Sequence, residues 1–233
     1  MRKIKTIFYY LLLSIVAVVL ILIMALAKPI TSNTTTFFDK LFIAGVFFVS
    51  CIFGISIAIY PNWWRKNKRN TDHNSNIQKS KTSRSFEGHH PDCNMFRSHI
   101  IIIKNKPRCA GCLGLTFGAL ISIFLMSLYL ILSFKLPIVI YYILLILGIL
   151  LLIFVYGEIM LSKRNMFFHI LLNSLLILSF LFITIIVVEL TENPVYGVLV
   201  VLLCFLWLDT RIHISNYQHQ RICSFCNQEC KSY

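Results

Sequence analysis

The chain has 233 residues, of which 58% are hydrophobic and 13% are charged. This apolar share argues against an ordinary soluble domain and indicates a protein that uses the lipid bilayer as solvent. Lys and Arg number 22 against 9 Asp and Glu, and in a membrane protein the distribution of that excess over the loops is more informative than the net charge.

Two long apolar runs lie in the first part of the chain, at residues 7–27 and 41–60. Each is close to the ~20 residues that a helix needs to cross the hydrocarbon core. A cleaved signal peptide is the alternative for the first run, because residues 1–5 are basic and Ala25-Leu26-Ala27 resembles a cleavage site. The run exceeds the roughly 7–15 apolar residues of a signal peptide, so a transmembrane helix is favoured.

Four further apolar runs cover residues 113–134, 138–160, 166–188 and 195–213. Inside hydrocarbon each backbone amide needs a partner within its own segment, which makes these runs helices despite their β-branched content. The predicted fold class is therefore an all-α membrane protein, a bundle of six transmembrane helices with a cytoplasmic Cys-rich metal-binding knuckle. Short connections around Pro137 and at residues 161–165 predict tight antiparallel pairs, with neighbouring helices packed in sequence order.

The positive charges are distributed unevenly over the predicted loops. If both termini face the cytoplasm, only Lys28, Lys40 and Lys135 lie on the outer face, and all other Lys and Arg residues lie inside. This is a strong form of the positive-inside pattern. We therefore expect a cell-membrane, multi-pass protein with cytoplasmic N- and C-termini.

The chain divides by composition into five parts: helices one and two at 1–60, a flexible basic cytoplasmic loop at 61–84, a Cys/His-rich segment at 85–112, helices three to six at 113–213, and a Cys-rich cytoplasmic tail at 214–233. The basic loop starts with Trp63-Trp64 followed by cations, which is typical of an interfacial anchor attracted to anionic lipid headgroups. Nucleic acid is disfavoured as a partner, because juxtamembrane cations are the default in this topology. Residues 100–103 are too short to span and are predicted to form a strand or an interfacial turn.

Six of the eight cysteines fall in the Cys/His-rich segment and the tail, on one side of the membrane. Two Cys-x-x-Cys pairs can supply the thiolates of a tetrahedral zinc site, and a reducing cytoplasm argues against structural disulfides. Either one four-ligand site or two sites of the Cys3His kind would satisfy this pattern, with Cys109, Cys112, Cys223 and Cys226 favoured. The full set of candidate metal ligands is Cys93, Cys109, Cys112, Cys223, Cys226, Cys230, His89, His90 and His99. Cys51 and Cys204 lie in apolar runs and are predicted to be inert.

Other chemistry is compatible with the same cysteines. An iron–sulfur cluster is a less favoured occupant of the ligand set. Cys109 and Cys112 also open directly onto the third predicted helix, whose dipole would stabilise a thiolate, as in a dithiol active site. Such a site would need a quinone or a thioredoxin-like protein as its redox partner.

Part of this segment carries a recognisable motif, formed by His89-His90-Pro91, Cys93, Arg97-Ser98, Pro107, Cys109, Cys112, Gly114 and Gly118. It resembles a family of small prokaryotic multi-pass membrane proteins of unknown function, whose shared motif is a cysteine, often an Arg-Ser, and then Pro-x-Cys-x-Arg-Cys-x-Gly leading into a helix. Gly111 stands where that family usually carries arginine. The resemblance implies a Cys motif ahead of a helix and no particular activity.

Two further features lie within the predicted helices. Glu158, His169, Asp209 and His213 fall at the inner ends of helices four to six. They predict either a polar cavity beneath the cysteines or simple interfacial pairing with nearby Lys and Arg residues. Gly114, Gly118 and Ser122 recur every four residues, which predicts a seam where another helix packs closely.

No convincing nucleophile, base and oxyanion set is present, so we expect a protein that is not an enzyme. The predicted function is an integral membrane protein with a structural zinc site that joins the loop to the tail, acting as a scaffold or as an accessory or assembly subunit of a membrane protein complex. The alternatives are a membrane thiol-disulfide oxidoreductase and a metal-handling transporter.

Overall fold

The computed structural model describes residues 2–26, 35–59, 100–103, 106–132, 136–160 and 165–223. Its helices are α1 (Arg2–Leu26), α2 (Phe37–Ile59), α4 (Ala110–Leu132), α5 (Ile138–Met160), α6 (Met166–Thr191) and α7 (Pro194–Cys223). All six contain a segment long and apolar enough to cross a membrane. The prediction of an α-helical bundle with six spans is confirmed, and the chain is an integral multi-pass membrane protein.

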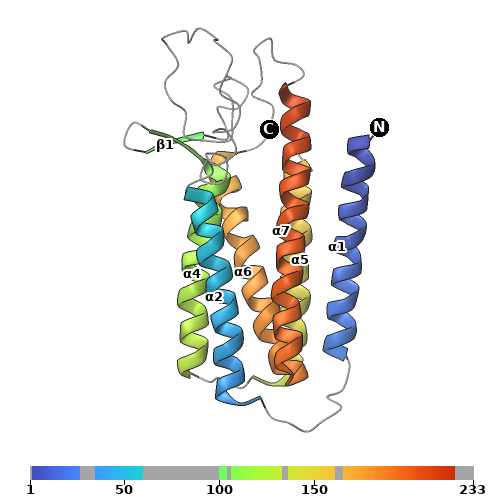
Figure 1. Cartoon of the computed structure of the whole chain (residues 1–233), viewed down its shortest axis with the longest axis vertical. Coiled ribbons are helices and arrows are strands. Elements are labelled where there is room, and N and C mark those ends of the chain that lie inside the picture. Colours follow the sequence, from blue (N-terminus) through green and yellow to red (C-terminus); the bar gives the residue numbers. More distant parts are fainter. Residues whose placement is uncertain are drawn as a thin grey trace, which may run out of the picture.

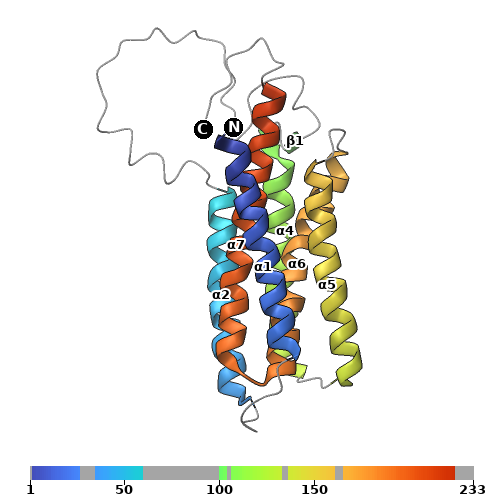
Figure 2. The same ribbon diagram turned by 90° about the vertical axis from the view of Figure 1, so that its right-hand side faces the viewer.

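The helices stand side by side and alternate in direction (Figures 1 and 2). α1 begins, and α7 ends, at the same end of the bundle. The N-terminus of α4 lies at that end too, with Cys109 and Cys112 beside it. We call it the cysteine end, and the other end, where α2 begins and α6 finishes, the opposite end.

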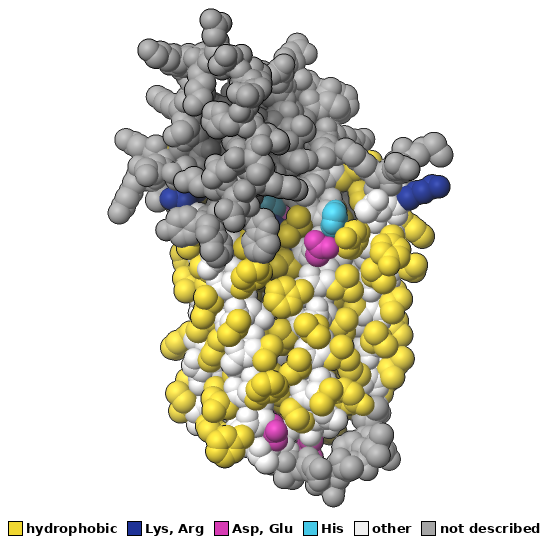
Figure 3. All heavy atoms as spheres, in the orientation of Figure 1, with side chains coloured by type: hydrophobic (Ala, Val, Ile, Leu, Met, Phe, Trp, Pro, Cys, Tyr) yellow, Lys and Arg dark blue, Asp and Glu magenta, His cyan; other side chains and the backbone are white. Residues whose placement is uncertain are grey.

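Apolar side chains cover the lateral surface of the bundle (Figure 3). Phe38 and Ile131, for example, are 78% and 77% exposed. A soluble protein would bury side chains of this size, because each exposes apolar area to water at a cost of about 25 cal/mol per Å². This surface matches a bilayer and explains why so apolar a sequence leaves so many large side chains on the outside.

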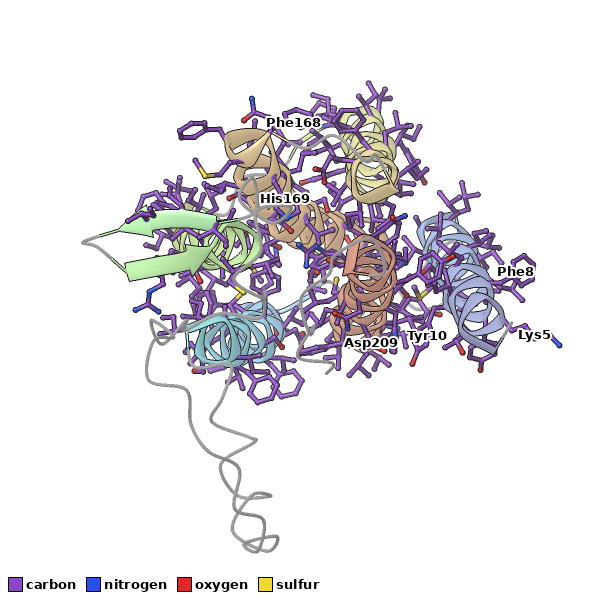
Figure 4. The ribbon with its side chains drawn as sticks, turned by 90° about the horizontal axis from the view of Figure 1, so that it is seen from above. Lys5, Phe8, Tyr10, Phe168, His169 and Asp209 are labelled. Carbon is purple, nitrogen blue, oxygen red and sulfur yellow. The ribbon has the colours of Figure 1, made fainter. Side chains whose placement is uncertain are left out.

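α6 is the central helix, because it packs against α4, α5, α7 and α1. It lies between α4 and α5 (Figure 4). The prediction that neighbouring helices pack in sequence order is therefore wrong for α4 and α5. The short connection at Pro137 fixes only the ends of those two helices, whereas the side chains along their length select the partner.

Small residues of α4 allow α6 to pack closely against it. A Cβ atom added at Gly114 would lie 2.4 Å from the Ile170 carbonyl oxygen, and one added at Gly118 would lie 2.6 Å from the Ser174 carbonyl oxygen. The Ser174 hydroxyl also donates a hydrogen bond of 2.8 Å to the Gly114 carbonyl. The predicted seam is confirmed, and it fixes the first turns of α4 against α6.

α1 belongs to the core of the bundle. Ala17 and Ile21 are 1% and 0% exposed, and α1 packs along α7. Hydrogen bonds join the two helices: the Ser14 and Thr210 hydroxyls are 2.9 Å apart, and the Trp207 indole N–H donates to the Ser14 carbonyl at 3.3 Å. This packing favours a permanent transmembrane helix over a cleaved signal peptide for this segment.

α7 continues beyond the end predicted at about His213 and reaches Cys223. No Gly or Pro interrupts residues 214–223, so nothing in the sequence stops the helix. At about 1.5 Å per residue its 30 residues exceed the ~30 Å thickness of a hydrocarbon core. The helix therefore carries its last residues past the membrane level at the cysteine end.

Candidate functional site

The two described cysteines of the cysteine end lie where a β-hairpin meets a helix. Strands β1 (Ile100–Ile103) and β2 (Lys106–Cys109) pair antiparallel, with Ile100 opposite Cys109. α4 begins at the next residue, so Cys109 closes the strand and Cys112 lies in the first helical turn. Of the two alternatives for residues 100–103, a strand or an interfacial turn, the structure has the strand.

The cysteine pair is compact. The thiols of Cys109 and Cys112 are hydrogen-bonded to each other, and the guanidinium of Arg211 lies near the Cys112 thiol. Neither thiol forms a disulfide with a described residue. Two thiols in this arrangement can bind one metal ion as thiolates or be oxidised to a disulfide.

The other predicted metal ligands lie outside the described residues or at their limit. Cys223 is the last residue of α7, and its side chain is not described. The remaining candidates, Cys93, Cys226, Cys230, His89, His90 and His99, are not described. Among the described residues, no group of three or more His, Cys, Asp or Glu side chains is gathered for a metal ion. The zinc site therefore stays a prediction.

Four polar side chains are buried beneath the cysteine pair. Glu158, His169, Asn173 and Arg211 are 5%, 5%, 1% and 7% exposed, respectively. The His169 Nδ1 atom lies 3.4 Å from Glu158 Oε2. The Asn173 amide donates to the His169 carbonyl and accepts a hydrogen bond from Arg211. These contacts join α5, α6 and α7 by polar groups at membrane depth, where unsatisfied polar groups are costly.

Gly111 allows this cluster to approach the start of α4. A Cβ atom at that position would lie 3.1 Å from His169 Nε2 and 3.4 Å from an Arg211 guanidinium nitrogen. His169 therefore directs Nδ1 toward Glu158 and Nε2 toward the backbone between the two cysteines. A larger residue at position 111 would push the imidazole and the guanidinium away.

A cavity of about 460 Å³ opens beside this cluster, between α2, α4, α6 and α7. Its polar lining includes Cys109, Cys112, His169 and Arg211, and its apolar lining includes Phe47, Ile57, Leu115, Phe180, Val201 and Phe205. The four helices that line it are grouped together when the bundle is seen from above (Figure 4). A partly polar cavity therefore lies near the cysteines, at the position that the sequence predicted.

The four ionisable residues predicted for that cavity separate into two pairs. His169 lines the cavity, and Glu158 contacts the Nδ1 side of the His169 ring. Asp209 and His213 instead pair with each other at 3.7 Å, with side chains 51% and 39% exposed. His213 stacks on Tyr10 of α1, and Asp209 lies beside Tyr10 (Figure 4). This second pair lies outside the cavity lining, and its two members contact each other rather than the Lys or Arg residues of the interfacial interpretation.

Sequence reasoning missed Asn173 and gave Arg211 only the role of an interfacial cation. A signal was present, since Asn173 falls one helical turn after His169 in an otherwise apolar helix. The position of Arg211 opposite Gly111 depends on how α7 packs against α4 and α6, which periodicity does not predict.

No family model matches the chain, and neither a curated protein nor a solved structure matches it. The resemblance of the cysteine motif to the family of small prokaryotic membrane proteins thus finds no support in these comparisons.

Proposed function

We propose that the protein is a membrane scaffold or assembly subunit whose cytoplasmic face is organised by a structural zinc site. The observation that carries the proposal is the hydrogen-bonded pair of Cys109 and Cys112, held between a strand and the first turn of a helix. A pair fixed in this way has little conformational freedom left to lose on metal binding, which favours a tight site. Zinc prefers sulfur and imidazole ligands, and both occur nearby in the sequence.

The uneven distribution of charge supports a cytoplasmic location for the cysteine end. Most Lys and Arg residues fall in segments that connect to the helices at this end, whereas Lys28, Lys40 and Lys135 belong to the other side. The positive-inside rule then assigns the cysteines to the cytoplasm. In that reducing compartment thiols persist and remain available to a metal.

Two sources can complete the ligand set of Cys109 and Cys112. Cys93 and His99 precede β1 by a few residues, and the Ile100–Cys109 pairing supports a local site formed with them. Cys223 lies at the last residue of α7. Arg211 lies level with Gly111, and the helix rises about 18 Å from there to Cys223. A joint site would therefore need the chain after Cys223 to return toward the bundle.

Metal analysis of the purified protein tests this proposal. We expect about one or two zinc ions per chain, with loss of zinc in Cys109→Ser. Loss in Cys226→Ser as well would identify the joint site, whereas loss in Cys93→Ser with retention in Cys226→Ser would identify the local one. Cys51→Ser is the matched control, because Cys51 lines the same cavity but lies in α2, and it should keep its zinc. Full zinc content in Cys109→Ser would refute the proposal.

A membrane thiol oxidoreductase is the second candidate, and the same thiol pair favours it. Cys109 and Cys112 lie at the N-terminus of α4 and line an apolar cavity. Oxidation of the two thiols to a disulfide would release two electrons and two protons, which a quinone could accept to become a quinol. Alkylation of thiols in intact cells distinguishes the candidates. A disulfide that forms and disappears with the quinone pool supports the enzyme, and thiols that stay reduced support the zinc site.

A further inference from the structure

We infer that the cavity between α2, α4, α6 and α7 binds one anionic lipid of the bilayer, with its apolar chain among the helices and its phosphate beside Arg211. The cavity volume of about 460 Å³ falls within the roughly 300–1,000 Å³ of known ligand pockets. This inference does not depend on zinc, because it assigns the lipid to Arg211 and to the apolar lining rather than to Cys109 and Cys112.

The cavity has an apolar part and a polar part, which match the two parts of an amphiphile. Its inner part is lined by Phe47, Phe180 and Val201, and its part nearest the cysteine end by Arg211 and Asn216. α7 lines it from Val201 to Asn216, which corresponds to a helical rise of about 22 Å. A long cavity with an apolar inner part and a polar mouth matches a hydrocarbon chain with a charged head.

Arg211 supplies the charge that such a head would need. Its side chain is 7% exposed and lines the cavity, and its hydrogen bond to Asn173 fixes its orientation. The planar guanidinium presents several donors and suits phosphate better than an ammonium group does. The first backbone N–H groups of α4, which begins at Ala110 beside the guanidinium, add a positive dipole end.

The nearby carboxylate does not oppose an anion directly. Glu158 contacts the Nδ1 side of His169 and is not part of the cavity lining. His169 therefore stands between Glu158 and the cavity. Among the described residues that line the cavity, the charged side chain is that of Arg211, a cation.

A lipid fits this position better than a soluble anion. The apolar lining residues belong to segments that span the membrane, and a soluble phosphate would leave that part of the cavity empty. Basic pockets between transmembrane helices near the headgroup level are known to bind anionic lipid heads. The bilayer also supplies this ligand laterally and at high concentration.

Native mass spectrometry of the delipidated protein in detergent tests the inference with three probes. We expect one phosphatidylglycerol per chain and binding of diacylglycerol, which has the chains without the phosphate, weaker by about tenfold or more, as expected when a hydrogen bond to a charged group is lost. Glycerol 3-phosphate, which has the head without the chain, should not compete. Equal binding of the two lipids, or competition by glycerol 3-phosphate, would overturn the inference.

Two substitutions and a matched control locate the site. Arg211→Gln should weaken phosphatidylglycerol binding by about tenfold or more and leave diacylglycerol binding unchanged. Gly54→Leu should displace the chain and weaken both lipids, because Gly54 lines the cavity and has open space around it. Gly45→Leu is the control, since Gly45 lies on the same helix with equally open space but outside the cavity. Unchanged lipid binding in Gly54→Leu would show that the lipid lies elsewhere and would reject the assigned site.

Discussion

The two ends of the bundle use buried charge in different ways. At the opposite end Lys40 pairs with Glu189, whose carboxylate also accepts a hydrogen bond from Tyr129, and Lys40 lies over the Tyr129 ring at 5.2 Å from its centroid. This contact joins α2, α4 and α6 into a closed cluster. At the cysteine end the charged cluster contains Arg211 and lies beside a cavity.

The packing of apolar residues also differs between the two ends of the bundle. Near the opposite end, Ile43, Met126 and Leu181 fill the space between α2, α4 and α6 and are at most 1% exposed. Near the cysteine end the corresponding space beside α7 is hollow and is lined by Ile57 and Leu208. The same helices thus form a solid core in one half and a cavity in the other. The densely packed half fixes the positions of the helices, so the other half can contain an open cavity.

The largest expected effect comes from breaking the ion pair at the opposite end. Glu189→Leu would leave Lys40 without its carboxylate partner, with a side chain only 15% exposed. We expect the free energy of unfolding to fall by about 3 kcal/mol, the scale for removal of one partner of a buried pair. Unfolding of the purified protein by sodium dodecyl sulfate, followed by circular dichroism, measures the change.

The double variant Lys40→Met/Glu189→Leu is the control for that experiment. Replacing both charges by apolar groups removes the buried lone cation, so most of the lost stability should return. If the double variant is as unstable as Glu189→Leu, the ion pair is not what closes this end.

A glycine-to-alanine comparison measures the difference in packing directly. A Cβ atom at Gly197 would lie 2.6 Å from a methyl group of Val188 and 2.9 Å from one of Ile43, both buried. At Gly54, beside the cavity, it would meet nothing within 4 Å. We expect Gly197→Ala to cost about 1–2 kcal/mol of unfolding free energy through overpacking, and Gly54→Ala to have little effect in the same assay. Equal costs at both positions would contradict the contrast between the halves.

The smallest effect is expected at the exposed ion pair of the cysteine end. Asp209 and His213 are about half and two-fifths exposed, and they lie one helical turn apart. Asp209→Asn should lower the free energy of unfolding by less than about 0.5 kcal/mol, as is typical of exposed pairs at this spacing. A loss comparable to that of Glu189→Leu would show that exposure does not distinguish the two ends.

Much of the fold followed from local sequence patterns. Long apolar runs gave the six helices to within a few residues at most ends, because helix formation in hydrocarbon depends only on the segment itself. The seam at Gly114 and Gly118 was predicted from the spacing of its small residues. For residues 100–103 the sequence left a strand and an interfacial turn as alternatives, and the structure has the strand. The end of α7 was predicted too early, because the apolar pattern stops at the membrane level while the helix does not.

The candidate site was predicted less completely. Cys109 and Cys112 were identified from their spacing, and their position at the start of a helix was correct. The sequence did not distinguish the buried pair, Glu158 and His169, from the exposed pair, Asp209 and His213. All four fall at similar depth in the membrane, and only the rotation of each helix decides which side chain faces inward.

The sequence by itself determined that this protein crosses the membrane through helices, and that a cysteine pair starts one of them, because both properties arise within short segments. The tertiary structure decided that α6 lies between α4 and α5, that Arg211 meets Gly111, and that a cavity remains beside them. These features depend on contacts between residues far apart in the chain. Such contacts are selected by the fit of small and large side chains along whole helices, which no local pattern contains.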